Sequence, residues 1–171
     1  MDETLIKNQT EEVIKKCKKK GYLIATAESC TGGMAASYLT SISGSSEIFD
    51  RGFITYSNLS KVELLGIDKG LINKYGAVSS ETAIAMALGA VSNSRANISL
   101  SITGVAGPSG GTDMNPVGTV YIAIANNNKT NYNKFNFENQ GRNFIRQSAV
   151  YEALRMIYLN IWNIKNPFFK G

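Results

Sequence analysis

The sequence predicts a single α/β domain, residues 1–171, with a mixed and mostly parallel sheet flanked by helices. Segments with the 3.6-residue period of amphipathic helices alternate with short β-prone segments, which is the pattern of a layered α/β fold. A length of 171 residues suits one ordinary domain. The apolar share of 43% and the charged share of 18% are those of a folded globular protein rather than a disordered one.

The first half of the chain predicts two strands and several helices. The first helix has apolar residues at helical spacing and stops at Gly21, since glycine accepts the left-handed conformation that ends many helices. A later helix opens with Ser79 as its N-cap, and its Ala/Met face (Ala83, Met86, Ala87 and Ala90) is expected to pack against the core. The expected elements are a helix 3–20, a strand 22–28, a helix 32–42, a strand 49–56, short helices 60–65 and 69–75, and a helix 81–90.

The second half predicts three strands and a closing helix. Residues 98–103 read ISLSIT, a buried strand that leads directly into a glycine-rich loop. Strands at 117–125 and 132–137 are joined by Asn126-Asn127-Asn128, which is typical of a hairpin turn. A helix over 141–162 closes the domain with an apolar stripe.

The charge pattern does not favour a nucleic-acid partner. The chain carries 18 Lys and Arg against 13 Asp and Glu, a formal charge of +5. Much of the excess lies in residues 15–20, at the end of the first predicted helix, where cations offset the helix dipole and stay solvated. No aromatic residues are interleaved there to stack on bases.

No membrane partner or export is expected either. No segment approaches the ~20 apolar residues of a membrane-spanning helix. The N-terminal segment carries early acidic residues and no apolar signal region. We therefore expect a cytoplasmic protein.

The absence of histidine narrows the possible chemistry most. Without histidine there is no Ser-His-Asp triad, no Cys-His pair, and no His-ligated zinc or haem. The two cysteines, Cys17 and Cys30, are too few for a Cys-only zinc site or a disulfide scaffold. A general base must come from Lys, Tyr, Asp, Glu, Cys or the terminal amine.

The first candidate site is the segment from Glu28 to Gly33, ESCTGG, between a strand and a helix. Unpaired N–H groups at a helix start can hold a phosphate or a developing oxyanion. Ligands in open α/β sheets bind beyond the carboxyl ends of the strands. Ser29 or Thr31 could equally serve only as a helix cap, and the position alone leaves both interpretations open.

The second candidate is Tyr56-Ser57-Asn58 followed by Lys61. With no histidine present, a lysine is the obvious group to activate a serine, provided that burial or a neighbouring cation lowers its pKa. Tyr56 could relay a proton or orient the amine. Taken alone, an exposed lysine in a short helix is the commoner situation.

The third candidate is the loop from Thr103 to Thr112. Its glycines permit close backbone approach to a ligand, and successive N–H groups can form an anion nest. It is neither a Walker A loop nor a dinucleotide fingerprint, because no Gly-Lys-Ser/Thr follows and its glycines open no helix. Long loops in compact domains are usually functional, which favours a ligand site over a plain surface turn.

Taken together, these stretches resemble one family. TAESCTGG, GFITYSNLSKVELLGI, GAVSSETAIAMA, SITGVAGPSGGT and PVGTVYIAIA, followed by GRNFIRQSAVYEAL, are similar to the CinA C-terminal domain family over roughly residues 5–160. Family members that act as enzymes are nicotinamide-nucleotide amidases, which hydrolyse the carboxamide of nicotinamide mononucleotide to nicotinate mononucleotide and ammonia. Longer relatives carry an additional N-terminal domain, so the resemblance implies a stand-alone amidase domain.

The resemblance also implies residue roles. Ser29 matches the nucleophile, Lys61 the general base and Tyr56 a supporting tyrosine. Neither a cofactor nor a metal is implied, and the partners are the small-molecule substrate and a second copy of the chain in a homo-oligomer, a dimer. The 5′-phosphate would be held by Arg142, Arg146 or the loop amides. The residues expected to bind substrate are Cys30, Thr31, Gly32, Gly33, Thr103, Gly104, Gly107 and Arg142.

Three alternatives stay open at this point. Cys30 is a rival nucleophile, because a thiolate beside a helix N-terminus is reactive, although a buried inert thiol is its ordinary state. The domain could be a catalytically silent ligand-binding or regulatory module. The third alternative is that the domain is a phosphate-loop nucleotide hydrolase.

Overall fold

The computed structural model describes residues 1–126 and 128–161 and contains one five-stranded sheet, in the order β2-β1-β3-β4-β5. β1 (Ile24–Glu28) pairs in parallel with both β2 (Phe49–Ile54) and β3 (Ile98–Gly104). β4 (Thr119–Asn126) runs antiparallel to β3 and to β5 (Thr130–Asn136). Only β4 is therefore reversed, and the predicted mixed, mostly parallel sheet is confirmed.

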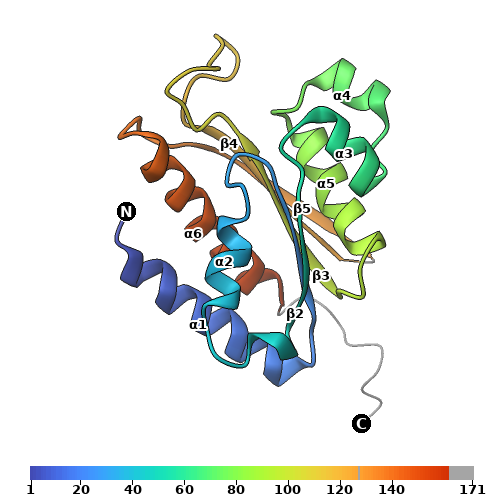
Figure 1. Cartoon of the computed structure of the whole chain (residues 1–171), viewed down its shortest axis with the longest axis vertical. Helices are drawn as coiled ribbons and strands as arrows, with labels where there is room; N and C mark the ends of the chain where they lie inside the picture. Colours follow the sequence, from blue (N-terminus) through green and yellow to red (C-terminus); the bar gives the residue numbers. More distant parts are fainter. Residues whose placement is uncertain (127, 162–171) are drawn as a thin grey trace.

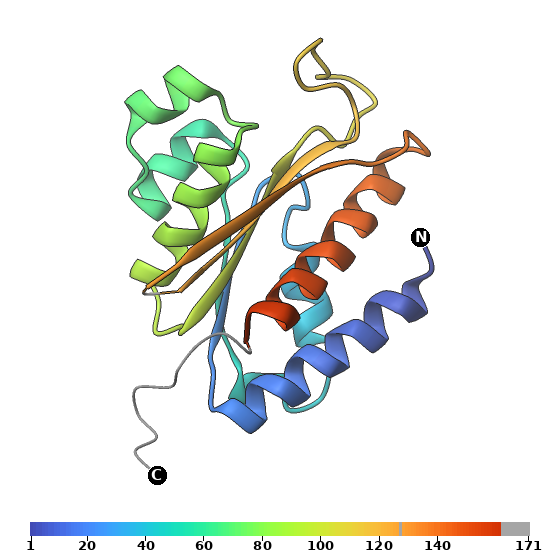
Figure 2. The same ribbon diagram turned by 180° about the vertical axis from the view of Figure 1, so that it is seen from behind.

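Helices cover both faces of this sheet (Figures 1 and 2). One face is covered by α1 (Glu3–Lys20), α2 (Met34–Thr40) and α6 (Arg142–Asn160). The other face is covered by α3 (Asn58–Leu65), α4 (Lys69–Tyr75) and α5 (Ser80–Ser92), and a short 3-10 turn spans Ser45–Glu47. The result is a three-layer α/β/α domain, as the alternation of elements predicts.

The two faces of the sheet pack differently. Isoleucine and leucine side chains of β1, β3 and β4 fill the layer beneath α1 and α6. The opposite face carries alanines and serines, whose small side chains let α5 approach closely. The side chains of α5 that were expected to pack against the core are fully buried: Ala83, Met86, Ala87 and Ala90. The hydroxyls of Ser99 and Ser101 donate to the α5 carbonyls of Ala87 and Ala83, each at 2.6 Å, so both of these buried hydroxyls are satisfied.

Individual residues explain where several of the helices and strands begin or end. Gly21 ends α1 with φ 64°, and the Ser79 hydroxyl accepts from the amide of Thr82 at 3.1 Å at the start of α5. β4 begins at Thr119 rather than at 117, directly after Gly118 with its φ of 99°. Residue 127 of the expected hairpin turn and residue 162 of the expected closing helix lie outside the described residues.

One lysine departs from the solvated face predicted for residues 15–20. Lys16 is only 8% exposed; its amine donates to the carbonyl of Tyr158 and lies 3.7 Å from the centre of that ring. The prediction is therefore wrong for Lys16, because α6 packs along α1 and covers it. No helix among residues 1–126 and 128–161 is long and apolar enough to cross a bilayer.

Candidate active site

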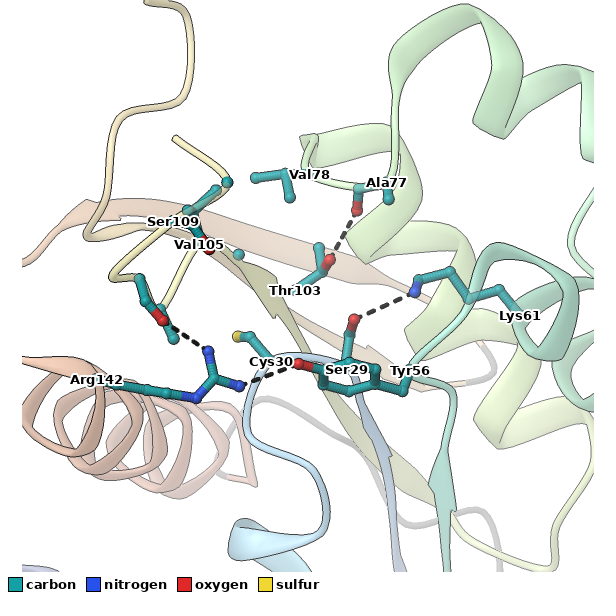
Figure 3. A pocket seen from close by; sticks show the side chains of 14 residues that line it. Ser29, Cys30, Tyr56, Lys61, Ala77, Val78, Thr103, Val105, Ser109 and Arg142 are labelled. Carbon is teal, nitrogen blue, oxygen red and sulfur yellow. Dashed lines mark hydrogen bonds between the residues drawn. The ribbon is translucent and has the colours of Figure 1, made fainter. Parts of the chain in front are cut away.

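The three candidate segments meet at one edge of the sheet. β2, β1 and β3 are parallel neighbours, so their carboxyl ends lie together. Ser29 follows β1, Thr55 and Tyr56 follow β2, and the glycine-rich loop follows β3. Figure 3 shows the hydroxyl of Ser29 beside the amine of Lys61, and Tyr56 beside Arg142.

A cavity of about 260 Å³ opens at this edge, near the lower end of the sizes found for ligand pockets. Most of the residues expected at the site line it: Ser29, Cys30, Tyr56, Lys61, Thr103, Gly104, Gly107 and Arg142. They are joined by Ala77, Val78, Val105, Ala106, Ser109 and Gly110. Thr31, Gly32 and Gly33 do not line the cavity, so the expected direct role of these three residues in binding substrate is not supported by their placement.

Lys61 lies buried against Ser29. Its Nζ is 3.2 Å from Ser29 Oγ and donates to the carbonyl of Thr55 at 2.8 Å. The side chain is only 1% exposed, which overturns the alternative of an exposed helix lysine. Burial lowers the pKa of the Lys61 amine, against a smaller opposing effect of Cys30. Low solvation and a short contact are the two conditions under which an amine can accept a proton from a serine.

The local sequence explains why Lys61 points inward. Ser57 caps α3 in a reciprocal box with Ser60, each side chain accepting from the other's amide, at 3.0 Å and 3.2 Å. This box starts the helix at Asn58, earlier than the predicted residue 60, and only residues 55–57 separate it from the end of β2. The first turn of α3 thereby directs Lys61 back toward the end of β1.

Tyr56 is placed differently from the expectation. Its hydroxyl accepts from Arg142 Nη2 at 3.0 Å, and the residue is 63% exposed. Among the described residues, no hydrogen bond joins Tyr56 to the amine of Lys61, which is oriented instead by the Thr55 carbonyl. Tyr56 therefore forms part of the cavity mouth, with Arg142 beside it (Figure 3).

The amides that follow Ser29 are largely occupied within the protein. The carboxylate of Glu28 accepts from the amides of Gly33, Ala35 and Ala36 at 2.9–3.0 Å, and the Gly32 amide donates to the Ser29 carbonyl at 3.1 Å. The amides of Gly32 and Gly33, which belong to the segment considered for holding an oxyanion, are thus already used. In the described part of the chain, the amides of Cys30 and Thr31 are the ones within this turn that donate to no carbonyl or carboxylate.

Cys30 presents an unreactive thiol. It is 7% exposed, and burial raises the pKa of the thiol to about 12. A protonated thiol is a poor nucleophile, so the arrangement favours Ser29 over Cys30.

Hydrogen bonds hold the glycine-rich loop and the residues beside it to neighbouring segments of the chain. Thr103 Oγ1 donates to the carbonyl of Ala77 at 2.7 Å, and Asn115 Nδ2 donates to that of Val78 at 3.1 Å. Gly104 allows close strand contact, because a Cβ there would lie 2.6 Å from the Thr119 carbonyl oxygen. Arg142 Nη1 donates to the Gly107 carbonyl at 2.8 Å.

Arg146, also considered for the phosphate, does not line the cavity; its Nη2 donates to the Thr31 carbonyl at 2.7 Å. Thr55 and Asn115 also have a part in the site and were not predicted, and Glu28 begins the first candidate segment but was given no role of its own. Only Glu28 carried a readable signal, a carboxylate just before a turn whose N-cap position, Gly33, has no capping side chain. Nowhere in residues 1–126 and 128–161 do three or more His, Cys, Asp or Glu side chains gather as a possible metal site.

Comparisons with known proteins give the family. The model of the CinA C-terminal domain matches residues 6–161. The chain belongs to the CinA C-terminal domain family. A CinA-like protein of Syntrophobacter fumaroxidans is 46% identical over 149 residues, covering 86% of this chain and 35% of that protein. This chain spans about a third of the length of such curated CinA relatives, from 31% to 39%.

Solved structures of the CinA superfamily share the fold closely. The competence/damage inducible protein CihA of Agrobacterium tumefaciens has a TM-score of 0.89 at 40% identity, covering 91% of this chain and 94% of that one. A CinA superfamily protein of Escherichia coli has a TM-score of 0.87 at 31% identity, covering 93% of each chain. The predicted family and fold are confirmed by these matches.

Proposed function

We propose that this CinA domain is a nicotinamide-nucleotide amidase, which hydrolyses the carboxamide of nicotinamide mononucleotide to nicotinate mononucleotide and ammonia. The observation that carries the proposal is the buried Lys61 amine 3.2 Å from the Ser29 hydroxyl, at the wall of a cavity. A serine with a desolvated amine beside it is a nucleophile and base for acyl transfer in a protein without histidine.

In the first half of the reaction, Ser29 Oγ forms a bond to the amide carbon and Lys61 Nζ takes the hydroxyl proton. The Thr55 carbonyl accepts one N–H of the neutral amine, which leaves the amine lone pair available to Ser29. When the tetrahedral intermediate collapses, the C–N bond breaks and Lys61 returns the proton to the departing nitrogen, which leaves as ammonia. The same lysine thus acts as base and then as acid.

In the second half, water attacks the acyl-enzyme ester. Lys61 accepts the proton of that water and returns it to Ser29 Oγ as the ester bond breaks, which releases the carboxylate. The oxyanion of both steps needs donors close to Ser29, and the amide of Cys30, the next residue, suits that role because it donates to no carbonyl or carboxylate of the described residues.

The cavity walls suit the remainder of the substrate. Val78 and Val105 offer apolar contact to a pyridine ring, and the loop around Gly107 and Ser109 offers backbone amides. Arg142, at the first turn of α6, brings a cation to the mouth, where the anionic 5′-phosphate would lie. Its guanidinium already bridges Gly107 and Tyr56, so binding would exchange or share these contacts.

The test is a comparison of purified wild-type protein with Ser29→Ala, incubated with nicotinamide mononucleotide while ammonia and nicotinate mononucleotide are measured. We expect stoichiometric products from the wild type and a loss of at least about 10³-fold in kcat for the variant, because the covalent step is removed. Ser41→Ala changes an exposed serine on the turn after α2 and serves as the matched control, with unchanged activity.

Other outcomes would identify the alternatives. Substrate binding without any product would favour a ligand-binding module, and release of inorganic phosphate would favour a nucleotide hydrolase. A Ser29→Ala variant that forms ammonia at the wild-type rate would show that Ser29 is not the nucleophile.

A further inference from the structure

Glu28 is a fully buried carboxylate directly before the proposed nucleophile. It ends β1, has 0% exposure, and its side chain points into the start of α2. Oε2 accepts from the amides of Gly33 and Ala35, each at 3.0 Å, and Oε1 accepts from that of Ala36 at 2.9 Å. The N-cap residue Gly33 has no side chain to cap the helix, so Glu28 supplies the cap from the preceding strand.

Hydrogen bonds therefore fix both ends of the turn that carries Ser29. At its start the Ser29 amide donates to the Ile102 carbonyl on β3 at 2.9 Å. At its end the Glu28 side chain holds the amides of Gly33 and the first turn of α2. Glu28 also reaches the base indirectly, because its backbone carbonyl accepts from the amide of Thr55, whose own carbonyl accepts from Lys61 Nζ.

Arg146 holds the same turn at a second point. It comes from α6, and its Nη2 donates to the Thr31 carbonyl at 2.7 Å in the middle of the turn. The same nitrogen would be 3.8 Å from a Cβ at Gly32, so the guanidinium lies directly against the turn. Glu28 and Arg146 also act on the neighbouring thiol of Cys30. Burial raises the pKa of this thiol most, the residue's own backbone amide lowers it, Glu28 raises it and Arg146 lowers it.

Neither side chain touches the reacting atoms. In the described residues, no hydrogen bond joins the Glu28 carboxylate or the Arg146 guanidinium to Ser29 Oγ or Lys61 Nζ, and neither residue lines the cavity. Their contacts go to the backbone that carries the hydroxyl. Any effect of these hydrogen bonds on the reaction must pass through the backbone that places Ser29 and, for Glu28, through the Thr55 carbonyl that orients Lys61.

We propose that Glu28 and Arg146 are positioning residues that hold the turn 29–33 at two separate points and thereby keep the Ser29 hydroxyl against the Lys61 amine. This inference rests on the proposed role of Ser29 as nucleophile. It separates two groups of residues: Glu28 and Arg146 set the reacting geometry, whereas Val78, Gly107 and Arg142 form the walls around the substrate.

The test uses Glu28→Gln, which keeps the shape of the side chain but turns one acceptor oxygen into a donor facing backbone N–H groups. A displacement of Ser29 by about 1 Å would lower kcat by roughly 10- to 100-fold. KM should stay within about threefold of the wild-type value, because the walls come from other elements. Asp2→Asn removes the capping carboxylate of α1, which accepts from the Thr4 amide at 2.8 Å, and should leave kcat unchanged.

Arg146→Gln is the second variant and decides the question if Glu28→Gln does not fold. It should show the same fall in kcat at nearly constant KM. Its matched control is Arg155→Gln on the same helix, which loses only an exposed ion pair with Glu152 and should keep its activity.

A crystal structure of each variant gives a readout that needs no substrate. We expect the separation between Ser29 Oγ and Lys61 Nζ to grow from 3.2 Å beyond hydrogen-bonding distance. A variant that keeps both this distance and the wild-type kcat, or that raises KM alone, overturns the positioning role. If the wild-type protein releases no ammonia, the amidase proposal fails, while the distance in the variants still decides whether Glu28 and Arg146 hold Ser29.

Discussion

Replacement of Lys61 by methionine is the most informative single perturbation of this site. Methionine keeps a similar unbranched length and removes the amine 3.2 Å from Ser29 Oγ. Loss of a general base typically lowers the rate by roughly 10² to 10⁴, which corresponds to about 3 to 5 kcal/mol of transition-state stabilisation. We expect the upper end of that range, because Lys61 is the only titratable side chain hydrogen-bonded to Ser29 among the described residues.

The same change has opposing effects on stability. The buried carbonyl of Thr55 loses its donor, which costs about 1–3 kcal/mol. The amine no longer has to be taken out of water, and an apolar side chain fills its place, which offsets that cost. The variant should therefore stay folded while activity falls by orders of magnitude, a pattern that separates a functional lysine from a structural one.

The lowered pKa of Lys61 adds a dependence on pH with a definite sign. Below the native pKa the amine is protonated in both states, and burying its charge reduces stability. Between that pKa and the ordinary value of 10.5, the unfolded chain binds a proton that the native state does not, so the wild type gains stability as pH rises. Methionine has no titratable group, so the variant lacks this pH-dependent contribution to stability. The free energy of unfolding of the wild type should thus increase relative to the variant through this window and level off above pH 10.5.

The measurements are ammonia release and denaturant unfolding at a series of pH values. For the wild type, kcat/KM should rise with pH and level off below pH 10.5, because the free amine is the active form. Lys61→Arg is the matched control for charge, since arginine keeps a donor but does not release its proton, and it should be as inactive as Lys61→Met. The reasoning is refuted if either variant keeps more than about a tenth of wild-type kcat, or if the stability difference does not change with pH.

Two further predictions concern the neighbours of this pair. Cys30→Ser should keep kcat within a few-fold of the wild type. The native thiol should resist alkylation near neutral pH, because burial raises its pKa to about 12. Strong inactivation of the wild type by a thiol reagent would contradict this prediction. Arg142→Gln should raise KM for nicotinamide mononucleotide by roughly 10-fold or more while leaving KM for nicotinamide riboside, which lacks the phosphate, almost unchanged. Equal effects on the two substrates would show that Arg142 acts through its bridge between Gly107 and Tyr56 rather than on the phosphate.

Several features of the site follow from residue types and order alone. The lack of histidine directs attention to lysine as the base, and the strand-turn-helix pattern around Ser29 and the glycine-rich loop after residue 103 place both segments at the carboxyl ends of strands. The order of elements also predicted the sheet with helices on both faces, because apolar periodicity and capping are encoded locally. The clearest examples are Gly21 and Ser79, whose roles at helix ends were predicted correctly.

Burial and hydrogen-bond partners, in contrast, were decided by segments far apart in the chain. Lys61 reads as an ordinary surface lysine until α3 packs it against a turn 32 positions earlier, and Tyr56 meets Arg142 across 86 positions. Of the amides in the turn after Ser29, that of Gly33 was already taken by Glu28 and that of Gly32 by the Ser29 carbonyl, a competition that only three-dimensional placement reveals. Local sequence sets backbone conformation, but desolvation and the choice among hydrogen-bond partners depend on which distant groups the fold brings within about 3 Å.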